Sequence, residues 1–110
     1  MTIRAVVRGV GHYLPERIVP NSEFEALVDT SDEWIVSRTG IRERRIAPRE
    51  QTASELGARA ASQAIADAGI EPASIDLIMT ATITGDFIWP ATACRIQDRL
   101  GLHGIPAFDI

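Results

Sequence analysis

The sequence is poor in the residues that form covalent cross-links and metal cages. Among 110 residues there is one cysteine, Cys94, which excludes an internal disulfide and a cysteine-based metal site. The two histidines, His12 and His103, have no partner at metal-ligand spacing. We therefore expect no metal, no cofactor and no catalytic role for either histidine.

Long apolar runs are missing as well. No run of about 18 apolar residues occurs, and a membrane-spanning helix needs one. The first residues, Met1–Arg4, lack the apolar core and cleavage site of a signal peptide, so we expect a cytoplasmic protein. The net charge is −4, whereas binding to a nucleic-acid backbone needs a positive face. Neither nucleic acid nor a membrane is an expected partner.

What is present is typical of a folded globular domain. Hydrophobic residues make up 45% and charged residues 24%, which excludes disorder, collagen and coiled coil. All eleven basic residues are arginine, and five of them fall within the segment 38–49.

Several segments carry the signals that begin and end helices. Three pairs have the spacing of a capping box: Ser22 with Glu25, Thr30 with Glu33, and Thr52 with Glu55. The second helix should end at Gly40, and the third should run to about Ala68 with Gly69 after it. Alanines recur every four residues along the third helix, which indicates that a neighbouring backbone approaches it closely.

Strands are predicted over 3–10, 76–83 and 105–110, because these segments are mostly apolar. Segment 76–83 is apolar at both alternating sets of positions, which is typical of a parallel strand covered on both faces. A helix is predicted over 91–100, with Pro90 in its first turn. This order favours an α/β layered fold with parallel strands. A buried strand at 105–110 would lack its cover, so we interpret the chain as a fragment.

The segment Asp29–Arg44, DTSDEWIVSRTGIRER, resembles the signature of the β-ketoacyl-[acyl-carrier-protein] synthase III family. The resemblance extends to three further segments, in the same order: Gly9–Pro15, Phe87–Cys94 and Pro106–Ile110. It implies a thiolase-type fold with five αβαβα layers. Residues 1–110 would then form a partial thiolase-like half-domain from the N-terminal half of that fold.

The resemblance also implies an acyltransferase that starts type II fatty-acid synthesis. The family condenses a short acyl-CoA, such as acetyl-CoA, with malonyl-ACP (ACP, acyl carrier protein), and it acts as a homodimer. Its nucleophile is a cysteine a few residues beyond the segment that matches Pro106–Ile110, and its catalytic histidine and asparagine come later. The chain would therefore stop just before the nucleophile, contain no catalytic residue, and be inactive alone. Cys94 is not that nucleophile.

The site residues that the resemblance carries over belong to coenzyme A binding. Trp34 matches the tryptophan that stacks on adenine, Arg38 the arginine at the base and phosphates, and Thr30 a residue near the same nucleotide. Positions four apart share a helix face, and an aromatic ring beside a guanidinium suits a base and a phosphate. Trp89 matches a residue that enters the partner subunit's acyl pocket, where its bulk would favour small acyl groups.

Other interpretations stay open at this point. The Arg42–Arg49 cluster could receive an acidic carrier protein, but we favour a solvated surface paired with carboxylates. Gly9-Val10-Gly11 lacks the third glycine of a dinucleotide-binding loop. As a whole, the chain could also be a non-catalytic coenzyme-A-binding or dimerisation module, or a thiolase-superfamily relative with other acyl substrates.

Overall fold

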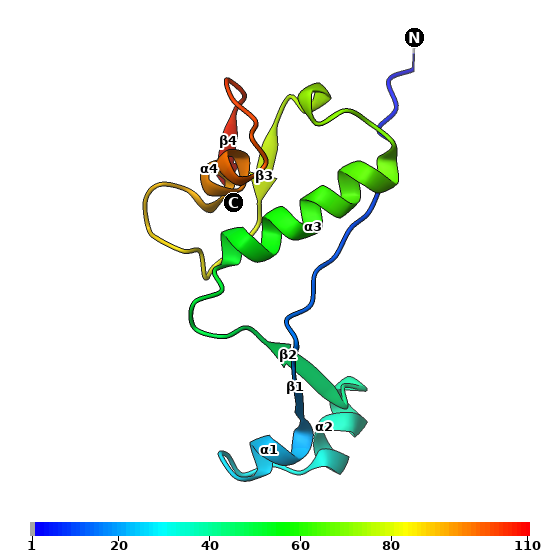
Figure 1. Ribbon diagram of the computed structural model, residues 1–110. Coiled ribbons are helices and arrows are strands. Elements are labelled where there is room, and N and C mark those ends of the chain that lie inside the picture. Colours follow the sequence, from blue (N-terminus) through cyan, green and yellow to red (C-terminus); the bar gives the residue numbers. More distant parts are fainter. Residues whose placement is uncertain (1) are drawn as a thin grey trace. The chain divides into compact units, whose positions relative to one another are not determined.

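Residues 2–110 are described by a computed structural model (Figure 1), and Met1 lies outside this description. The chain forms two compact units, of which one is Leu14–Glu50 and the other joins the described residues up to Tyr13 with Gln51–Ile110. Within residues 2–110, no helix is both long enough and apolar enough to cross a membrane. In the same range, no group of three histidine, cysteine or acidic side chains could hold a metal ion.

The unit Leu14–Glu50 is built on a two-stranded antiparallel sheet. Its elements are, in order, β1 (Arg17–Pro20), α1 (Asn21–Glu25), α2 (Asp32–Thr39) and β2 (Glu43–Ile46). In the sheet, Val19 pairs with Arg44, and Val19 is only 2% exposed. The β1 strand was not predicted from the sequence, because its two apolar residues are adjacent and show no alternation.

The predicted capping box at Ser22 is wrong. α1 begins directly after Pro20 without a side-chain cap. It ends at Glu25, and the N–H groups of Leu27 and Val28 both donate to the Phe24 carbonyl. The Glu25 carboxylate does not reach back to Ser22; it accepts a 2.7 Å bond from the Asp32 N–H.

The capping residue of α2 is Ser31 rather than Thr30. The Ser31 hydroxyl accepts a 3.1 Å bond from the Trp34 N–H, so the N-cap lies one residue later than predicted. The end of the helix is as predicted, since Gly40 takes up the left-handed conformation with φ 72°. Glycine adopts that conformation without the steric cost of a Cβ.

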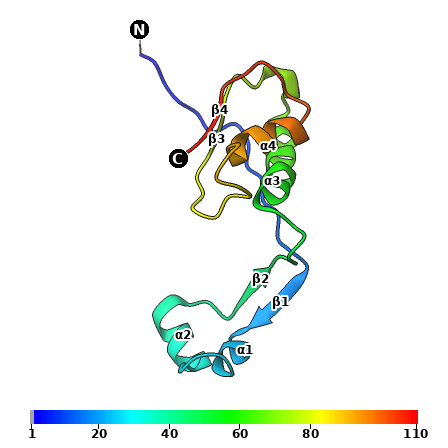
Figure 2. The same cartoon turned by 90° about the vertical axis from the view of Figure 1, so that its left-hand side faces the viewer.

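The second unit is an α/β arrangement. Its elements are α3 (Ala53–Ala68), the 3₁₀ turn η1 (Pro72–Ser74), β3 (Ile78–Thr80), α4 (Thr92–Arg99) and β4 (Ala107–Asp109). β3 and β4 pair in parallel, with Met79 opposite Phe108, as the sequence predicts. α4 packs against α3 and against both strands (Figure 2).

Two features of these strands differ from prediction. β3 and β4 are short, at three residues each. They are also covered on one side only, since Met79 and Phe108 both leave their side chains exposed. Within the described residues, α4 supplies the cover of the other face.

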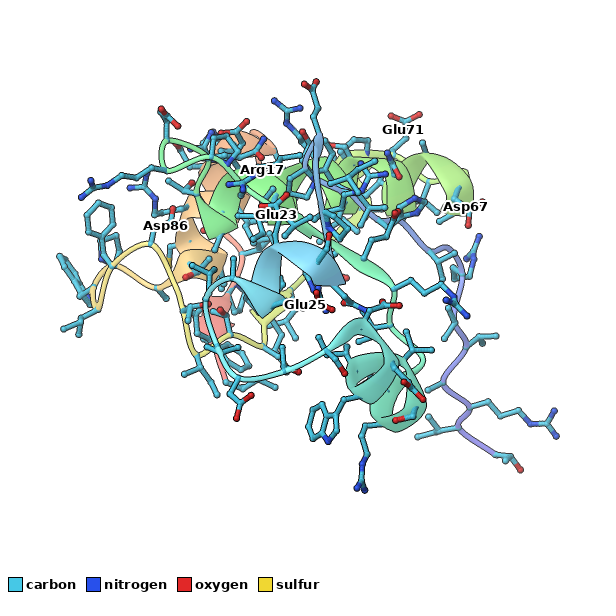
Figure 3. The ribbon with its side chains drawn as sticks, turned by 90° about the horizontal axis from the view of Figure 1, so that it is seen from below. Arg17, Glu23, Glu25, Asp67, Glu71 and Asp86 are labelled. Carbon is cyan, nitrogen blue, oxygen red and sulfur yellow. The ribbon has the colours of Figure 1, made fainter. Side chains whose placement is uncertain are left out.

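The predicted strand over 3–10 does not form; the segment is extended, and only its end, from Gly9 on, meets α3 (Figure 1). The Val10 N–H donates to the Asp67 carboxylate over 2.9 Å, and the His12 N–H donates to the Gln63 side chain over 3.3 Å. Asp67 lies on α3 in Figure 3. Side chains of the helix thus take up backbone donors that a sheet ladder would use.

The close approach predicted from the alanines of α3 is confirmed. A Cβ added at Gly9 would lie 2.8 Å from the Cβ of Ala68, and one at Gly11 would lie 2.5 Å from the backbone nitrogen of Ala64. Real Cβ atoms do not come so near, so glycine on one side and alanine on the other allow the contact.

The two helices of this unit begin in different ways. Thr52 caps α3 as predicted, by accepting a 3.4 Å bond from the Glu55 N–H, but the Glu55 carboxylate pairs with Arg59 instead of reaching back. α4 begins at Thr92, so Pro90 precedes its first turn. Its free N–H groups at Thr92 and Ala93 donate to the Asp109 carboxylate, over 2.7 and 2.8 Å.

Candidate functional site

Trp34 and Arg38 form an exposed pair on α2. Trp34 is 56% exposed, and the Arg38 guanidinium carbon lies 5.9 Å from the centre of the indole. This confirms that the two residues share one helix face. The distance is within the range of a cation–π contact, and the spacing leaves both groups open to a ligand.

Thr30 lies beside the same tryptophan. A hollow of about 410 Å³ is lined by Asp29, Thr30, Ser31 and Trp34. The Thr30 hydroxyl oxygen is buried and has no hydrogen-bond partner within residues 2–110. Buried polar atoms are normally paired, so this hydroxyl is an exception in the wall of the hollow.

Asn21 was not identified from the sequence; its side chain bonds residues at the start of α2 and just after its end. Its amide nitrogen donates to the Asp32 carboxylate over 2.7 Å and to the Ile41 carbonyl over 2.8 Å. Its oxygen accepts a 2.8 Å bond from Arg44. The residue is 1% exposed. In the sequence it shows only as a polar residue at a helix start, so no signal there could have found this role.

The arginines of segment 42–49 were expected to pair with carboxylates, and the structure shows other partners. Arg44 bonds Asn21 and lies over the Phe24 ring, 4.4 Å from its centre, while Arg45 donates to the Pro15 carbonyl over 3.0 Å. No ion pair within residues 2–110 joins this cluster to a carboxylate. Arg44 and Arg45 therefore have a structural role, because they bond other parts of this unit.

A second polar cluster surrounds Asp86 in the other unit. Its side chain is 1% exposed and accepts bonds from the backbone and hydroxyl of Ser54, and from Arg95 over 2.9 Å. Burial raises the pKa of Asp86, but the bonds from Ser54, Thr52 and Arg95 outweigh it and hold the pKa below its ordinary value. Burial acts likewise on Asp109, and the N–H groups of α4 hold its pKa low.

Curated relatives match this chain over its whole length. No protein-family model matches the chain. A curated β-ketoacyl-[acyl-carrier-protein] synthase III from Cereibacter sphaeroides is 58% identical over 110 residues, which are 100% of this chain and 34% of that protein. The chain is related over its whole length to β-ketoacyl-[acyl-carrier-protein] synthase III. It spans about one third of the length of the curated synthases that it matches.

Solved structures agree with this relationship. The 3-oxoacyl-[acyl-carrier-protein] synthase III of Aquifex aeolicus matches with a TM-score of 0.85 at 47% identity, over 93% of this chain and 33% of that chain. The priming β-ketosynthase of the R1128 polyketide pathway matches with a TM-score of 0.87 at 40% identity, over 94% of this chain and 31% of that chain. The predicted thiolase-type α/β class of condensing enzymes is confirmed. The extent of the half-domain stays a prediction.

Two other residues of the synthase resemblance lie in the unit of α3 and α4. Trp89 is 85% exposed, on the segment between β3 and α4. Cys94 is in the first turn of α4, is half-buried, and has its thiol 3.5 Å from the Ala107 carbonyl.

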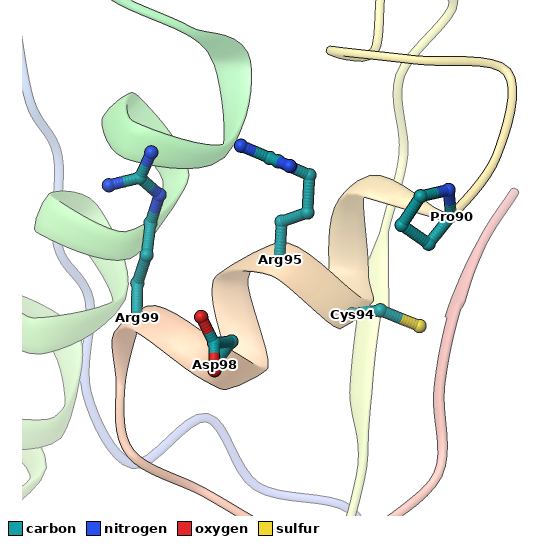
Figure 4. A pocket seen from close by; sticks show the side chains of 5 residues that line it. All are labelled: Pro90, Cys94, Arg95, Asp98 and Arg99. Atoms are coloured by element: carbon teal, nitrogen blue, oxygen red, sulfur yellow. The ribbon is translucent and has the colours of Figure 1, made fainter.

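A hollow of about 440 Å³ along α4 does not add a catalytic group to the candidate site. It is lined by Pro90, Cys94, Arg95, Asp98 and Arg99 (Figure 4). The Cys94 thiol points away from the two guanidinium groups in this view. Arg95 is held by Asp86, and Arg99 donates to the Ser54 hydroxyl over 3.2 Å. The arginines therefore belong to the cluster around Asp86.

Proposed function

We propose that this chain is the coenzyme-A-binding part of a β-ketoacyl-ACP synthase III. In the reaction, the acyl group of a short acyl-CoA passes to a cysteine thiolate and releases coenzyme A. Malonyl-ACP then loses carbon dioxide, and its carbanion takes the acyl group to give 3-oxoacyl-ACP. The nucleophile is expected outside these 110 residues, so the chain alone would be inactive. A cytoplasmic location and a homodimer belong to the same proposal.

The grouping of Trp34, Arg38 and Thr30 carries this proposal. An exposed indole offers a flat face on which adenine stacks, and such stacking contributes about 1–3 kcal/mol per base. The Arg38 guanidinium has planar donors that suit a phosphate. Thr30 lines the hollow beside Trp34, and rotation of its side chain would turn the unpaired hydroxyl toward a polar atom of the nucleotide. Together they supply a stacking face, a charge and a hydrogen bond for coenzyme A.

Substitution of Trp34 tests the proposal in a full-length synthase that carries these 110 residues. Trp34→Ala should raise KM for acyl-CoA roughly tenfold, because the stacking face is lost, while KM for malonyl-ACP stays unchanged. Trp34→Phe is the matched control and should keep most of the affinity. An equal effect of Trp34→Ala on both substrates, or no effect, contradicts the proposal.

Substitution of Arg38 separates the phosphate contact from the base contact. Arg38→Ala should weaken coenzyme A more than its dephosphorylated analogue, because only the former has the 3′-phosphate. Binding is measured by calorimetry with both ligands. Equal weakening of the two would remove the phosphate from the proposed role of Arg38.

A second candidate is a condensing enzyme with other acyl substrates. The likeness to a priming β-ketosynthase of a polyketide pathway, at a TM-score of 0.87, favours it. In the proposed homodimer, the bulk of the exposed Trp89 would limit the length of the partner's acyl pocket. The size of the acyl group accepted therefore separates the two candidates. A panel of acyl-CoA primers of increasing length separates the candidates.

A further inference from the structure

α2 displays Trp34 and Arg38 but has little packing of its own. None of its residues is fully buried, and Ile35 and Val36 are half-buried. Apolar packing alone therefore does not set how the helix is turned. Its orientation depends on the bonds made where it begins and just beyond where it ends.

Asn21 makes bonds at both of these places. Its amide nitrogen donates to the carboxylate of Asp32, the first residue of α2, and to the carbonyl of Ile41, which follows the capping Gly40. Both N–H groups of one amide are thus used on α2 and the residue after its cap. An asparagine amide has two such donors, so none is left over.

The other side of Asn21 is tied to the sheet. Its side-chain oxygen accepts from Arg44 over 2.8 Å, and its backbone N–H donates to the Arg42 carbonyl over 3.2 Å. Arg44 lies on β2 and is itself stacked over Phe24. Because Asn21 is buried and fully bonded, its amide links α2 rigidly to β2.

We infer that Asn21 is a positioning residue for coenzyme A binding. It does not touch the ligand; it holds α2 so that Trp34 and Arg38 face the nucleotide together. This inference rests on the proposed function of those two residues. It differs from a purely structural role, because loss of Asn21 should impair acyl-CoA binding in protein that is still folded.

Asn21→Asp is the first test, in a full-length synthase that carries these 110 residues. The substitution keeps the bond from Arg44 but turns the donor that faces Asp32 and Ile41 into an oxygen. We expect KM for acyl-CoA to rise roughly fivefold to tenfold, with kcat and KM for malonyl-ACP within about twofold. A lower Tm with both KM values unchanged would overturn the inference.

The double variant Asn21→Asp with Asp32→Asn is the rescue. It exchanges donor and acceptor, so the bond between the two side chains can form again with the net charge unchanged. KM for acyl-CoA should return part of the way, since the Ile41 carbonyl still lacks its donor. Absence of any rescue would show that the bond between residues 21 and 32 does not set KM for acyl-CoA, and would overturn the inference.

Asp32→Ala keeps the inference testable if Asn21→Asp does not fold. It removes one of the bonds and leaves Asn21 in place. Loss of a negative charge should by itself lower KM for an anionic ligand, so a rise of roughly threefold supports positioning, and a fall overturns it. Arg17→Gln is the control in the same unit. It breaks only the exposed pair with Glu23, seen in Figure 3, and should change neither KM.

Trp34→Ala separates the two proposals. If Trp34→Ala leaves KM for acyl-CoA unchanged, the proposed function of α2 fails. If Trp34→Ala raises KM and the folded Asn21→Asp variant does not, the inference about Asn21 alone is overturned.

Discussion

The two units of the chain bury different kinds of residue. Within residues 2–110, the unit Leu14–Glu50 buries Pro15, Val19 and Asn21. The other unit buries four apolar residues and two hydroxyls: Ala58, Ala93, Ile96, Leu102, Ser54 and Thr92. Within the small unit, a bonded amide sets the orientation of α2. Within the larger unit, closely packed helices set the geometry. Where apolar burial is scarce, hydrogen bonds decide geometry.

The largest loss of stability is expected in the second unit, where the backbone at Gly11 packs against the backbone of α3. Gly11→Ala should lower the free energy of unfolding by about 3 kcal/mol, because the new Cβ meets the backbone of Ala60 and Ala64. Urea denaturation followed by circular dichroism measures it.

The matched control for Gly11→Ala is Gly40→Ala in the other unit. Gly40 has φ 72° and nothing within 4 Å of its ideal Cβ, so only backbone strain of about 1 kcal/mol is expected. If the two substitutions cost the same, close packing would not distinguish the units.

An intermediate loss of stability is expected at the polar cluster around Asp86. Asp86→Asn should cost about 2 kcal/mol at pH 7, because the charge-assisted bond from Arg95 is lost and an amide donor faces the Ser54 N–H. Asp98→Asn is the control, since the Asp98 carboxylate makes none of the bonds described for residues 2–110. Equal costs for the two variants would show that Asp86 does not hold the cluster together.

The same substitution has a predicted pH dependence. The pKa of Asp86 in the folded chain is below its ordinary value of 3.8, so the unfolded chain takes up the proton first as pH falls. The stability from Asp86 is therefore present above about pH 4 and lost as pH falls through the lower folded pKa. Denaturation curves of the wild type and Asp86→Asn should converge on acidification below pH 4. Divergence there contradicts the sign.

The smallest effect is expected at the surface of the small unit. Arg17 and Glu23 form a 2.8 Å ion pair in which both side chains are largely exposed. Arg17→Gln should change the free energy of unfolding by less than about 0.5 kcal/mol, because solvent screens such pairs. Thermal denaturation in low and high salt checks this, and a cost above 1 kcal/mol would mean that surface charge also holds this unit together.

Local signals were enough for several elements. The bounds of α3 follow from Thr52 and Gly69, because a capping hydroxyl and a left-handed glycine act within one turn of the helix. The shared face of Trp34 and Arg38 follows from helical spacing in the same way. The end of α2 at Gly40 is also local.

Elements that depend on a distant partner were not predictable. The segment 3–10 has the composition of a strand, yet it forms none, and the N–H groups of Val10 and His12 bond side chains of α3. β1 has almost no pattern, yet it pairs with β2. Whether a strand pairs in a sheet depends on the segments that lie beside it, and the strand's own residues do not specify those segments.

The sequence by itself determined both ends of α3, the end of α2 at Gly40, the parallel α/β class and the residues that mark the synthase relationship, because each depends on neighbours a few positions apart. Tertiary structure decided that Asn21 joins α2 to β2 and that Asp86 gathers Ser54 and Arg95. It also decided that Asp109 caps α4. These polar side chains bond groups 9 to 32 residues away. A polar residue carries the capacity for such bonds in its chemistry, but only folding chooses the partner.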